Sequence, residues 1–318
     1  MPTPKLTDEQ CVESLNLVEE YGSGHMAVLA LGSKTALTRD TIERRAAQGR
    51  VRNLRPTFNR DAPRIYQRQR LGKMHLVIPD VQMKPGVRDD HLSWIGNYIV
   101  EKRPDVIVCI GDFADMPSLS VYDKGKLPFE GRRYVNDVKS VRRAMEKLLA
   151  PIDDYNRTAK ERYAPRKVLT MGNHEHRIIR VVDENPEFQG KFDLDDLGYK
   201  DFGWEVHDYL EVVEIDGVQY SHFFTSGVRG NPVSSAAALL RERQTSATMG
   251  HVQYTDIAVH KKTQKIAMFC GTCYLHDEAY LSRQDNSQRR QIVVKHEVED
   301  GLYDPMLVSL RFLEKAYG

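Results

Sequence analysis

The sequence of 318 residues is poor in cysteine and has no long apolar run. Its four cysteines are too few for a disulfide framework in a chain of this length. The uninterrupted apolar runs are only a few residues long, whereas a membrane-spanning helix needs about 20. A basic start followed by an apolar stretch and a small-residue cleavage site is also missing, so no secretory signal is predicted. We therefore expect a soluble, cytoplasmic protein without a membrane partner.

The chain as a whole has almost no net charge, but individual segments are strongly charged. Lys and Arg total 46 and Asp and Glu total 45, which gives a net charge of +1. Residues 34–73 nevertheless carry +9, and the segments 1–33 and 74–318 on either side carry −4 each. A basic block beside a nearly neutral body is typical of an arm that binds a polyanion. The alternative is a solvated linker that its own charge keeps extended.

Residues 7–49 have the pattern of three short helices. Thr7 is a suitable N-cap for the first helix, after which apolar residues recur at helical spacing. Residues 22–24 (Gly-Ser-Gly) separate it from a second helix at 25–31, and Thr38 can cap a third over 39–48. Ile42 and Ala46 are expected to face inward on this third helix. Its outward-facing arginines are predicted to be Arg39, Arg44 and Arg45.

The stretch MAVLALGSKTALTRDTIERRAAQGR resembles a helix-turn-helix of the Fis or resolvase kind. In that arrangement the third helix enters the major groove of DNA. The candidates for nucleic-acid contact are Arg39, Arg44, Arg45, Arg50, Arg52 and Arg55. The segment from Gly32 to Thr38 is longer than the turn of the motif, however. The alternative is a helical bundle used for oligomerisation, for example in a homodimer.

Residues 50–73 contain two prolines, no apolar periodicity and an arginine every few positions. We therefore predict a basic linker over 50–73 that joins a helical domain over 1–49 to a larger domain over 74–318. Phe58 and Tyr66 in this linker could stack on nucleic-acid bases.

From residue 74 the pattern is that of an α/β protein. Strands are predicted at 75–79, 106–110 and 167–171, with helices near 90–102 and 136–150 between them. After residue 205 three hairpins are predicted, at 210–224 around an Asp-Gly turn, at 255–270, and at 291–312, with a helix near 234–243. The first three strands each end in a polar cluster, and in a parallel sheet such clusters converge at the carboxyl ends.

Five polar clusters occur in one order along the chain. They are D-x-Q at 80–82, GDxxD at 111–115, GNHE at 172–175, a histidine at a strand end at 222, and GHxQ at 250–253. Carboxylate and amide oxygens hold hard divalent cations, and imidazoles add affinity for first-row transition metals. Two such ions polarise a phosphoryl group and generate a metal-bound hydroxide for in-line attack. The clusters therefore indicate a two-metal phosphoester site.

This order of clusters resembles that of the calcineurin-like metallophosphoesterase superfamily, and the match spans roughly residues 74–255. An arginine-bearing helical N-terminus joined to such a body is also similar to phosphoesterases encoded by bacteriophages, which would work in the host cytoplasm. The resemblance implies an α/β fold, a four-layer α/β/β/α metallophosphoesterase sandwich, here preceded by the small helical domain.

The resemblance also implies roles for the cluster residues. Asp112 would bridge two ions, the first held also by Asp80, Gln82 and Gln253 and the second by Asn173, His222 and His251. His174 would lie beside the scissile phosphate and donate to a non-bridging oxygen or protonate the leaving group. Asp115 would orient His174.

Gln82 and Gln253 depart from the family pattern, which usually has histidine at both positions. Both fall on the first ion, which is left without an imidazole. A glutamine oxygen is a neutral and harder ligand, so we expect two divalent ions with Mn²⁺ preferred, and Mg²⁺, iron or Zn²⁺ as the alternatives. A degenerate centre that holds one ion and catalyses nothing is the other interpretation.

Several further residues are candidates on weaker patterns. His176 and Arg177 follow the GNHE cluster and His276 lies near a strand end, so all three are candidates for substrate binding. Cys270 and Cys273 have the spacing of a zinc knuckle but lack a second pair, and we expect buried structural thiols.

We therefore favour a hydrolase, namely a metal-dependent phosphodiesterase that acts on nucleic acid. Within that class, a DNA nuclease is the favoured activity. The same fold hosts other phosphoesterases, so a phosphomonoesterase acting on phosphoprotein or nucleotide is an alternative. A non-catalytic DNA-binding protein with a degenerate metal site is a further alternative.

Overall fold

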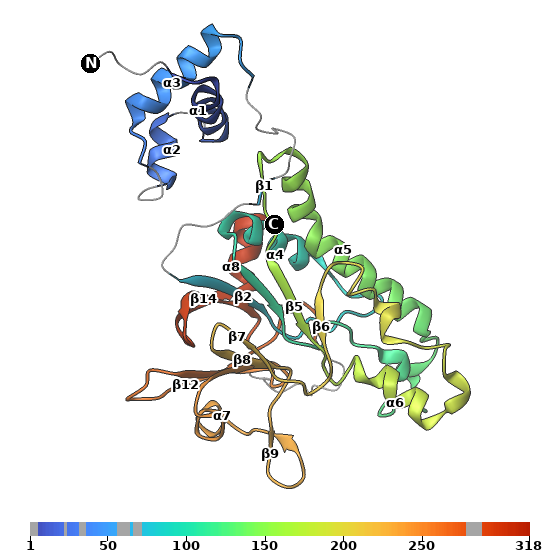
Figure 1. The fold of residues 1–318 in the computed structure, drawn as a ribbon. Helices are drawn as coiled ribbons and strands as arrows, with labels where there is room; N and C mark the ends of the chain where they lie inside the picture. Colours follow the sequence, from blue (N-terminus) through green and yellow to red (C-terminus); the bar gives the residue numbers. More distant parts are fainter. Residues whose placement is uncertain (1–5, 22–23, 32–35, 56–63, 66–71, 278–287) are drawn as a thin grey trace. The chain divides into compact units, whose positions relative to one another are not determined.

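The computed structural model describes residues 6–21, 24–31, 36–55, 64–65, 72–277 and 288–318. The chain divides into two compact units, Met1–Arg64 and Ile65–Gly318 (Figure 1). The predicted linker over 50–73 spans this division. Phe58 and Tyr66, the linker aromatics expected to stack on bases, lie outside the described residues.

The N-terminal unit consists of the three predicted helices, α1 (Asp8–Tyr21), α2 (Gly24–Leu31) and α3 (Arg39–Val51). Thr7 caps α1, since its Oγ1 accepts from the backbone N–H of Gln10 at 3.2 Å while the Gln10 side chain accepts from the N–H of Thr7. Thr38 caps α3 through the N–H of Thr41. The buried apolar side chains of the three helices include Cys11, Leu15, Ala27, Ile42 and Ala46, and Ser14 is a buried polar residue among them.

The arginines of this unit differ from the prediction in one respect. Arg45 does not face outward, because its side chain is only 17% exposed and lies 4.0 Å from Glu13 of α1. Arg52 pairs with Asp8 at 2.8 Å. Arg52 is nevertheless exposed, as are the other four candidates for nucleic-acid contact: Arg39, Arg44, Arg50 and Arg55. Arg39 also pairs with Glu43 at 3.1 Å.

The C-terminal unit begins with a six-stranded sheet in the order β15-β14-β2-β3-β5-β6. Its parallel strands are β2 (Lys73–Ile78), β3 (Val106–Cys109), β5 (Arg166–Thr170) and β6 (Glu205–His207). The antiparallel pair β14 (Gln291–Glu299) and β15 (Leu302–Ser309) extends the sheet beside β2. The helices α4 (Asp90–Lys102) and α5 (Tyr134–Thr158) connect the parallel strands as predicted.

A five-stranded sheet has the order β12-β13-β11-β8-β7. Its strands are β7 (Val213–Ile215), β8 (Val218–Ser221), β11 (Ser246–Met249), β12 (Thr255–Val259) and β13 (Ile266–Cys270). Two of the predicted hairpins, β7–β8 and β12–β13, are confirmed. The third is shorter than predicted, because Ser309 caps α8 (Leu310–Tyr317) by accepting from the N–H of Phe312. Residues 310–312 are therefore helical, not extended.

The remaining elements are short. They are α6 (His176–Glu184) and α7 (Ala236–Arg243), the strands β1 (Arg64–Ile65), β4 (Glu161–Arg162), β9 (Thr225–Ser226) and β10 (Asn231–Pro232), and the 3-10 turns η2 (Pro117–Leu119), η3 (Leu127–Phe129), η4 (Pro186–Phe188) and η5 (Leu194–Leu197). Among the described residues, no helix is long and apolar enough to cross a membrane.

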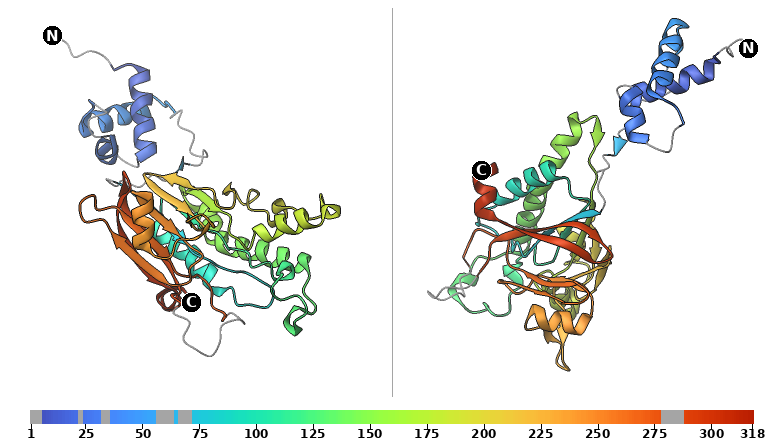
Figure 2. Two further views of the ribbon diagram at one scale, coloured as in Figure 1. Left: turned by 90° about the horizontal axis from the view of Figure 1, so that it is seen from below. Right: turned by 90° about the vertical axis from the view of Figure 1, so that its left-hand side faces the viewer.

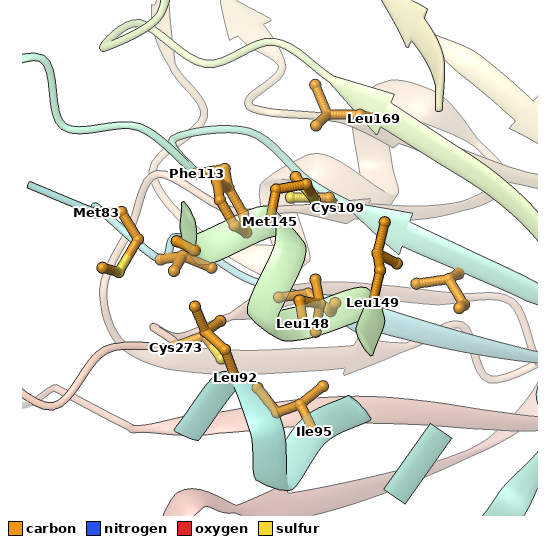
Figure 3. Close-up of a cluster of buried hydrophobic side chains, with 14 of the residues drawn as sticks. Met83, Leu92, Ile95, Cys109, Phe113, Met145, Leu148, Leu149, Leu169 and Cys273 are labelled. Atoms are coloured by element: carbon orange, nitrogen blue, oxygen red, sulfur yellow. The ribbon is translucent and has the colours of Figure 1, made fainter. Parts of the chain in front are cut away.

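The two large sheets pack face to face between outer layers of helix (Figures 1 and 2). Val77 and Val108 of the first sheet join Tyr220 and Met268 of the second in one buried cluster. The opposite face of the first sheet packs on α4, α5 and α8, and Figure 3 shows part of this cluster. Leu239 of α7 packs on the opposite face of the second sheet. Burial of each large apolar side chain stabilises this arrangement by about 1.5–3 kcal/mol. The layers, helix on sheet on sheet on helix, confirm the predicted four-layer α/β/β/α sandwich.

One polar group interrupts the apolar contact between the sheets. Lys295 of β14 is fully buried, and its ammonium nitrogen lies 4.4 Å from the centres of both the Tyr220 and the Tyr303 rings and bonds to Thr248. Nearby, His75 bonds to the hydroxyl of Tyr220 at 2.8 Å and to Asp216 at 3.0 Å. Burial lowers the pKa of Lys295 to about 7.

Candidate metal centre

The predicted cluster residues lie at the carboxyl ends of strands from both sheets. Asp80, Asp112 and Asn173 follow β2, β3 and β5, which are adjacent and parallel. His222 follows β8 and His251 follows β11, which are adjacent and parallel in the other sheet. Because parallel strands present their carboxyl ends at one edge, five segments far apart in the sequence meet there.

Asn173 and two histidines form the closest group in this centre. The side-chain oxygen of Asn173 lies 2.8 Å from Nδ1 of His251 and 3.0 Å from Nε2 of His222. Nε2 of His222 is also 3.3 Å from Oδ2 of Asp112. One potential ligand atom each from Asp112, His222 and His251 lie within 4.8 Å of one another. Nδ1 of His222 is 2.9 Å from the carbonyl oxygen of Ile110, to which its N–H can donate, so Nε2 can present a lone pair to a cation.

Asp80 and Gln82 contribute oxygen atoms that have no protein partner. Both side chains are buried, and neither Oδ2 of Asp80 nor Oε1 of Gln82 has a hydrogen-bond donor among the described residues. The other carboxylate oxygen of Asp80 accepts from the N–H of His251 at 3.0 Å. A buried oxygen without a donor costs about 1–3 kcal/mol, and a divalent cation would remove that cost. The donor set therefore fits a divalent metal.

The backbone at this centre is held in an unfavourable conformation. Gln82, Asp112 and His251 have positive φ angles of 47°, 48° and 62°. Each such residue costs about 1–3 kcal/mol, and such conformations cluster at functional sites. Gly172 is required by the close approach of Asp112, since a Cβ at this position would lie 2.0 Å from Oδ1 of Asp112.

Glu175 stabilises the loops that carry these ligands. Its buried carboxylate accepts from the backbone N–H groups of Asp112 at 3.0 Å, Ala114 at 2.8 Å and Gly172 at 3.0 Å. The hydroxyl of Tyr199 lies 3.2 Å away. Burial and the neighbouring Asp112 raise the pKa of Glu175. The sequence prediction gave Glu175 no role, although it is part of the GNHE cluster.

His174 and Asp115 lie together as the family resemblance implied. Nδ1 of His174 is 2.9 Å from Oδ1 of Asp115, and its Nε2 is 3.7 Å from Oδ2 of Asp112. Arg177 donates to the carbonyl oxygen of Asp115 at 2.7 Å, and its Nη2 lies 3.1 Å from Nε2 of His174. Lys84 holds the second carboxylate oxygen of Asp115 at 2.8 Å. No pattern in the sequence indicated Lys84.

Burial and the charges of the centre shift the pKa values of its titratable groups in opposite directions. Burial raises the pKa of Asp80 to about 7. Burial acts against the charge of Asp112 as well, but His174 and His222 outweigh it and lower the pKa of that carboxyl. Burial disfavours the imidazolium of His222, yet Asp112 and Asp80 raise its pKa to about 9. Burial and the proximity of His222 lower the pKa of His251 to about 4, which suits a neutral imidazole ligand.

Three predicted residues have partners that the sequence did not indicate. The side-chain oxygen of Gln253 accepts from Nε2 of Gln288 at 2.8 Å. The ring of His176 stacks on Tyr209 with 4.6 Å between ring centres. The ring of His276 stacks in the same way on Tyr274. Cys270 and Cys273 are buried free thiols, as predicted.

Comparison with known proteins gives one decisive match. The family model of calcineurin-like phosphoesterases matches residues 75–286, two thirds of the chain.

The chain belongs to the calcineurin-like phosphoesterase family.

This phosphoesterase has no significant match among the curated proteins. Among solved structures, 35 chains match, and one of them aligns over 75% of this chain and 100% of its own with 12% identity and a TM-score of 0.38. Membership supports metal-dependent hydrolysis of phosphoesters, and divalent metals are the cofactors of the family. The donor atoms gathered around Asp112 agree with that chemistry.

Proposed function

We propose that this phosphoesterase is a metal-dependent phosphodiesterase that acts on nucleic acid, most specifically a DNA nuclease. The observation that carries the proposal is the basic block of residues 34–73, with a charge of +9, in the same chain as a phosphoesterase domain. Arg44, Arg50 and Arg55 in this block are exposed. Clustered exposed arginines bind the phosphates of nucleic acid. The helix-turn-helix character of the N-terminal unit and the phage-type relationship stay predictions.

Two groups of side chains would hold the metal ions, with Asp112 between them. Asp80, Gln82 and Gln253 would hold the first ion, and Asn173, His222 and His251 the second. Bound ions would polarise the phosphoryl oxygens and activate water at neutral pH. Mn²⁺ is the proposed metal, because the first group offers only oxygen donors and the second adds imidazoles.

His174 would assist the departure of the leaving group. Asp115 accepts from Nδ1 of His174 and so directs Nε2 toward the metal-ligand side, where Asp112 lies 3.7 Å away. A protonated Nε2 would then donate its proton to the leaving oxygen. Arg177 contacts Nε2 in this structure. When substrate binds, Arg177 would turn from His174 to a phosphoryl oxygen, because a guanidinium pairs strongly with a phosphate.

The test is a matrix of substrates in the presence of Mn²⁺: single-stranded DNA, duplex DNA, RNA, an aryl phosphodiester and an aryl phosphomonoester. We expect both DNA and the aryl diester to be hydrolysed faster than the monoester. DNA cleavage should also weaken steeply with salt, because phosphate contacts release counterions. A preference for the monoester that salt does not change would overturn the proposal in favour of a phosphomonoesterase.

Charge substitutions separate the contribution of the N-terminal unit. The triple variant Arg44→Gln, Arg50→Gln, Arg55→Gln should bind DNA more weakly and lower the salt slope of binding, and hydrolysis of the aryl diester should be unchanged. The control is Arg241→Gln, a substitution on α7. Equal DNA binding by the triple variant and the wild-type protein would refute the link between the basic block and the substrate.

A further inference from the structure

A cleft of about 880 Å³ opens beside His174 in the C-terminal unit. One wall is the segment from Pro117 to Asp137, which contains η2 and η3 and leads into α5. The remaining walls include Lys84 and Pro85 from the loop after β2, and His174 with Arg177 at the start of α6. The volume lies within the range of about 300–1,000 Å³ that small-molecule sites occupy. The proposed catalytic chemistry uses only the His174 end of this cleft.

The long wall of the cleft is fixed by its own polar contacts. The N–H of Ser118 donates to the buried carboxylate of Asp137 at 2.9 Å. Arg132 donates to the carbonyl oxygen of Pro117 at 3.1 Å and to Asp123 at 2.8 Å. These bonds tie both ends of the segment together across 20 residues. The wall is therefore a preformed surface, as a binding subsite requires.

The acids of the cleft are mostly engaged by protein partners. Asp115 lies against His174 and Lys84, Asp123 accepts from Arg132, and Asp277 pairs with Arg290. Glu130 is exposed. These ion pairs reduce the negative potential of the cleft toward an incoming anion.

The exposed side chains of the long wall include an aromatic ring and two cations, beside Glu130 and Asn136. Tyr122 is 77% exposed. Lys126 is 61% exposed, with its nitrogen 3.7 Å from Asp123. Arg133 is exposed, and its Nη1 donates to the carbonyl oxygen of Arg132 at 2.8 Å. A ring that is 77% exposed gains little packing energy within this chain. An aromatic platform beside basic side chains is the combination that holds single-stranded nucleic acid, because any base can stack and every nucleotide carries a phosphate.

We infer that this cleft is the subsite for the nucleic-acid strand on the leaving-group side of the scissile phosphate. A base stacks on Tyr122, and the next backbone phosphate lies on Lys126 and Arg133. The placement follows from His174, which lines the cleft and is the residue positioned to protonate the leaving group. The inference rests on the proposed phosphodiesterase function and specifies its substrate as an unpaired strand of at least two nucleotides.

The test compares two substrates of one enzyme. Single-stranded DNA of about 12 nucleotides carries the base and the second phosphate that the subsite would bind, whereas bis(4-nitrophenyl) phosphate carries neither. Tyr122→Ala should lower the ratio of kcat/KM for DNA to that for the aryl diester by about 5-fold or more, because the mutant loses the stacking of one base. Tyr122→Phe, which keeps the ring, should retain the ratio. Lys126→Ala with Arg133→Gln should lower the ratio and the salt slope.

A binding measurement provides a readout that does not depend on turnover. Fluorescence anisotropy of labelled single-stranded DNA in the presence of a chelator should give a Kd that Tyr122→Ala raises about 10-fold. Lys262→Ala, on the exposed turn between β12 and β13, is the control and should change neither measurement. Unchanged ratios and Kd in Tyr122→Ala, with an active wild-type enzyme, would overturn the subsite and leave the proposed function standing. A wild-type enzyme that hydrolyses neither diester would overturn both.

Discussion

Lys295 offers a quantitative test of the packing between the two sheets. Its ammonium group is fully buried, and burial lowers its pKa from 10.5 to about 7. In the unfolded chain the same group returns to its ordinary pKa, so between these two values the unfolded state binds more protons than the folded state. The free energy of unfolding must then rise as the pH rises from about 7 to 10.5, and it is lowest below pH 7. The perturbation is Lys295→Met, which keeps an unbranched side chain and removes the charge.

The magnitude follows from the size of the pKa shift. A fall in pKa from 10.5 to about 7 corresponds to a cost of up to about 5 kcal/mol when the lysine is charged. Attraction of the ammonium to the rings of Tyr220 and Tyr303 favours the charged form, and so about 5 kcal/mol is an upper bound. Between pH 7 and pH 9 the free energy of unfolding of the wild-type protein should therefore rise by up to about 2 kcal/mol relative to Lys295→Met.

The assay is urea unfolding at several pH values between 7 and 10, with a chelator present so that metal binding adds no pH dependence. His222 and the titrating groups that Lys295 does not influence are common to both proteins and cancel in the difference. Burial lowers the pKa of His75 to about 4 and raises the pKa of Cys270 to about 12; Lys295 acts to lower both values, which lie outside the pH range of the assay. Lys262→Met, an exposed lysine replaced in the same way, should follow the wild-type curve. Parallel curves for the wild-type protein and Lys295→Met would refute the reasoning.

Three further predictions concern the metal centre. Gly172→Ala places a carbon 2.0 Å from Oδ1 of Asp112; equilibrium dialysis should show at least about 10-fold weaker Mn²⁺ binding with the circular dichroism spectrum retained, and wild-type affinity would contradict this. Asp115→Asn should lower kcat by about 100-fold at unchanged metal content, because His174 loses the carboxylate that orients it, and a wild-type kcat would contradict this role. Glu175→Ala leaves three backbone donors without their acceptor; urea unfolding should show a loss of about 3 kcal/mol or more, and a loss below about 1 kcal/mol would show that water replaces the carboxylate.

The sequence predicted the fold and the convergence of Asp80, Asp112 and Asn173 because both depend on a simple rule, whereas His222 and His251 were assigned to the centre only by the family resemblance. Buried parallel strands are recognisable from their apolar runs, and the residues directly after such strands gather at one edge of the sheet. Hairpins with an Asp-Gly turn are equally local in their signal, which is why β7 and β8 were correctly predicted.

The sequence did not predict the contacts between segments that are distant along the chain. Lys84 meets Asp115 only because the loops after β2 and β3 run side by side, and the exposure of Tyr122 depends on a wall tied together by Arg132 and Asp137. Arg45 was expected to face solvent from its place on one helix, but the packing of α1 on α3 brings it against Glu13. The strand prediction for 310–312 failed because a single capping serine, Ser309, starts a helix there.

The most direct test of the central claim is the rate of single-stranded DNA cleavage as a function of Mn²⁺ concentration, measured for the wild-type protein and for Asp112→Asn after both have been freed of metal. Asp112 lies between His174 and His222 and is placed in both groups of metal ligands. We predict that the metal-free wild-type protein is inactive, that Mn²⁺ restores cleavage in a saturable way, and that Asp112→Asn stays inactive at every concentration. Cleavage without metal, or equal cleavage by Asp112→Asn, would contradict a metal-dependent phosphodiesterase centred on this aspartate.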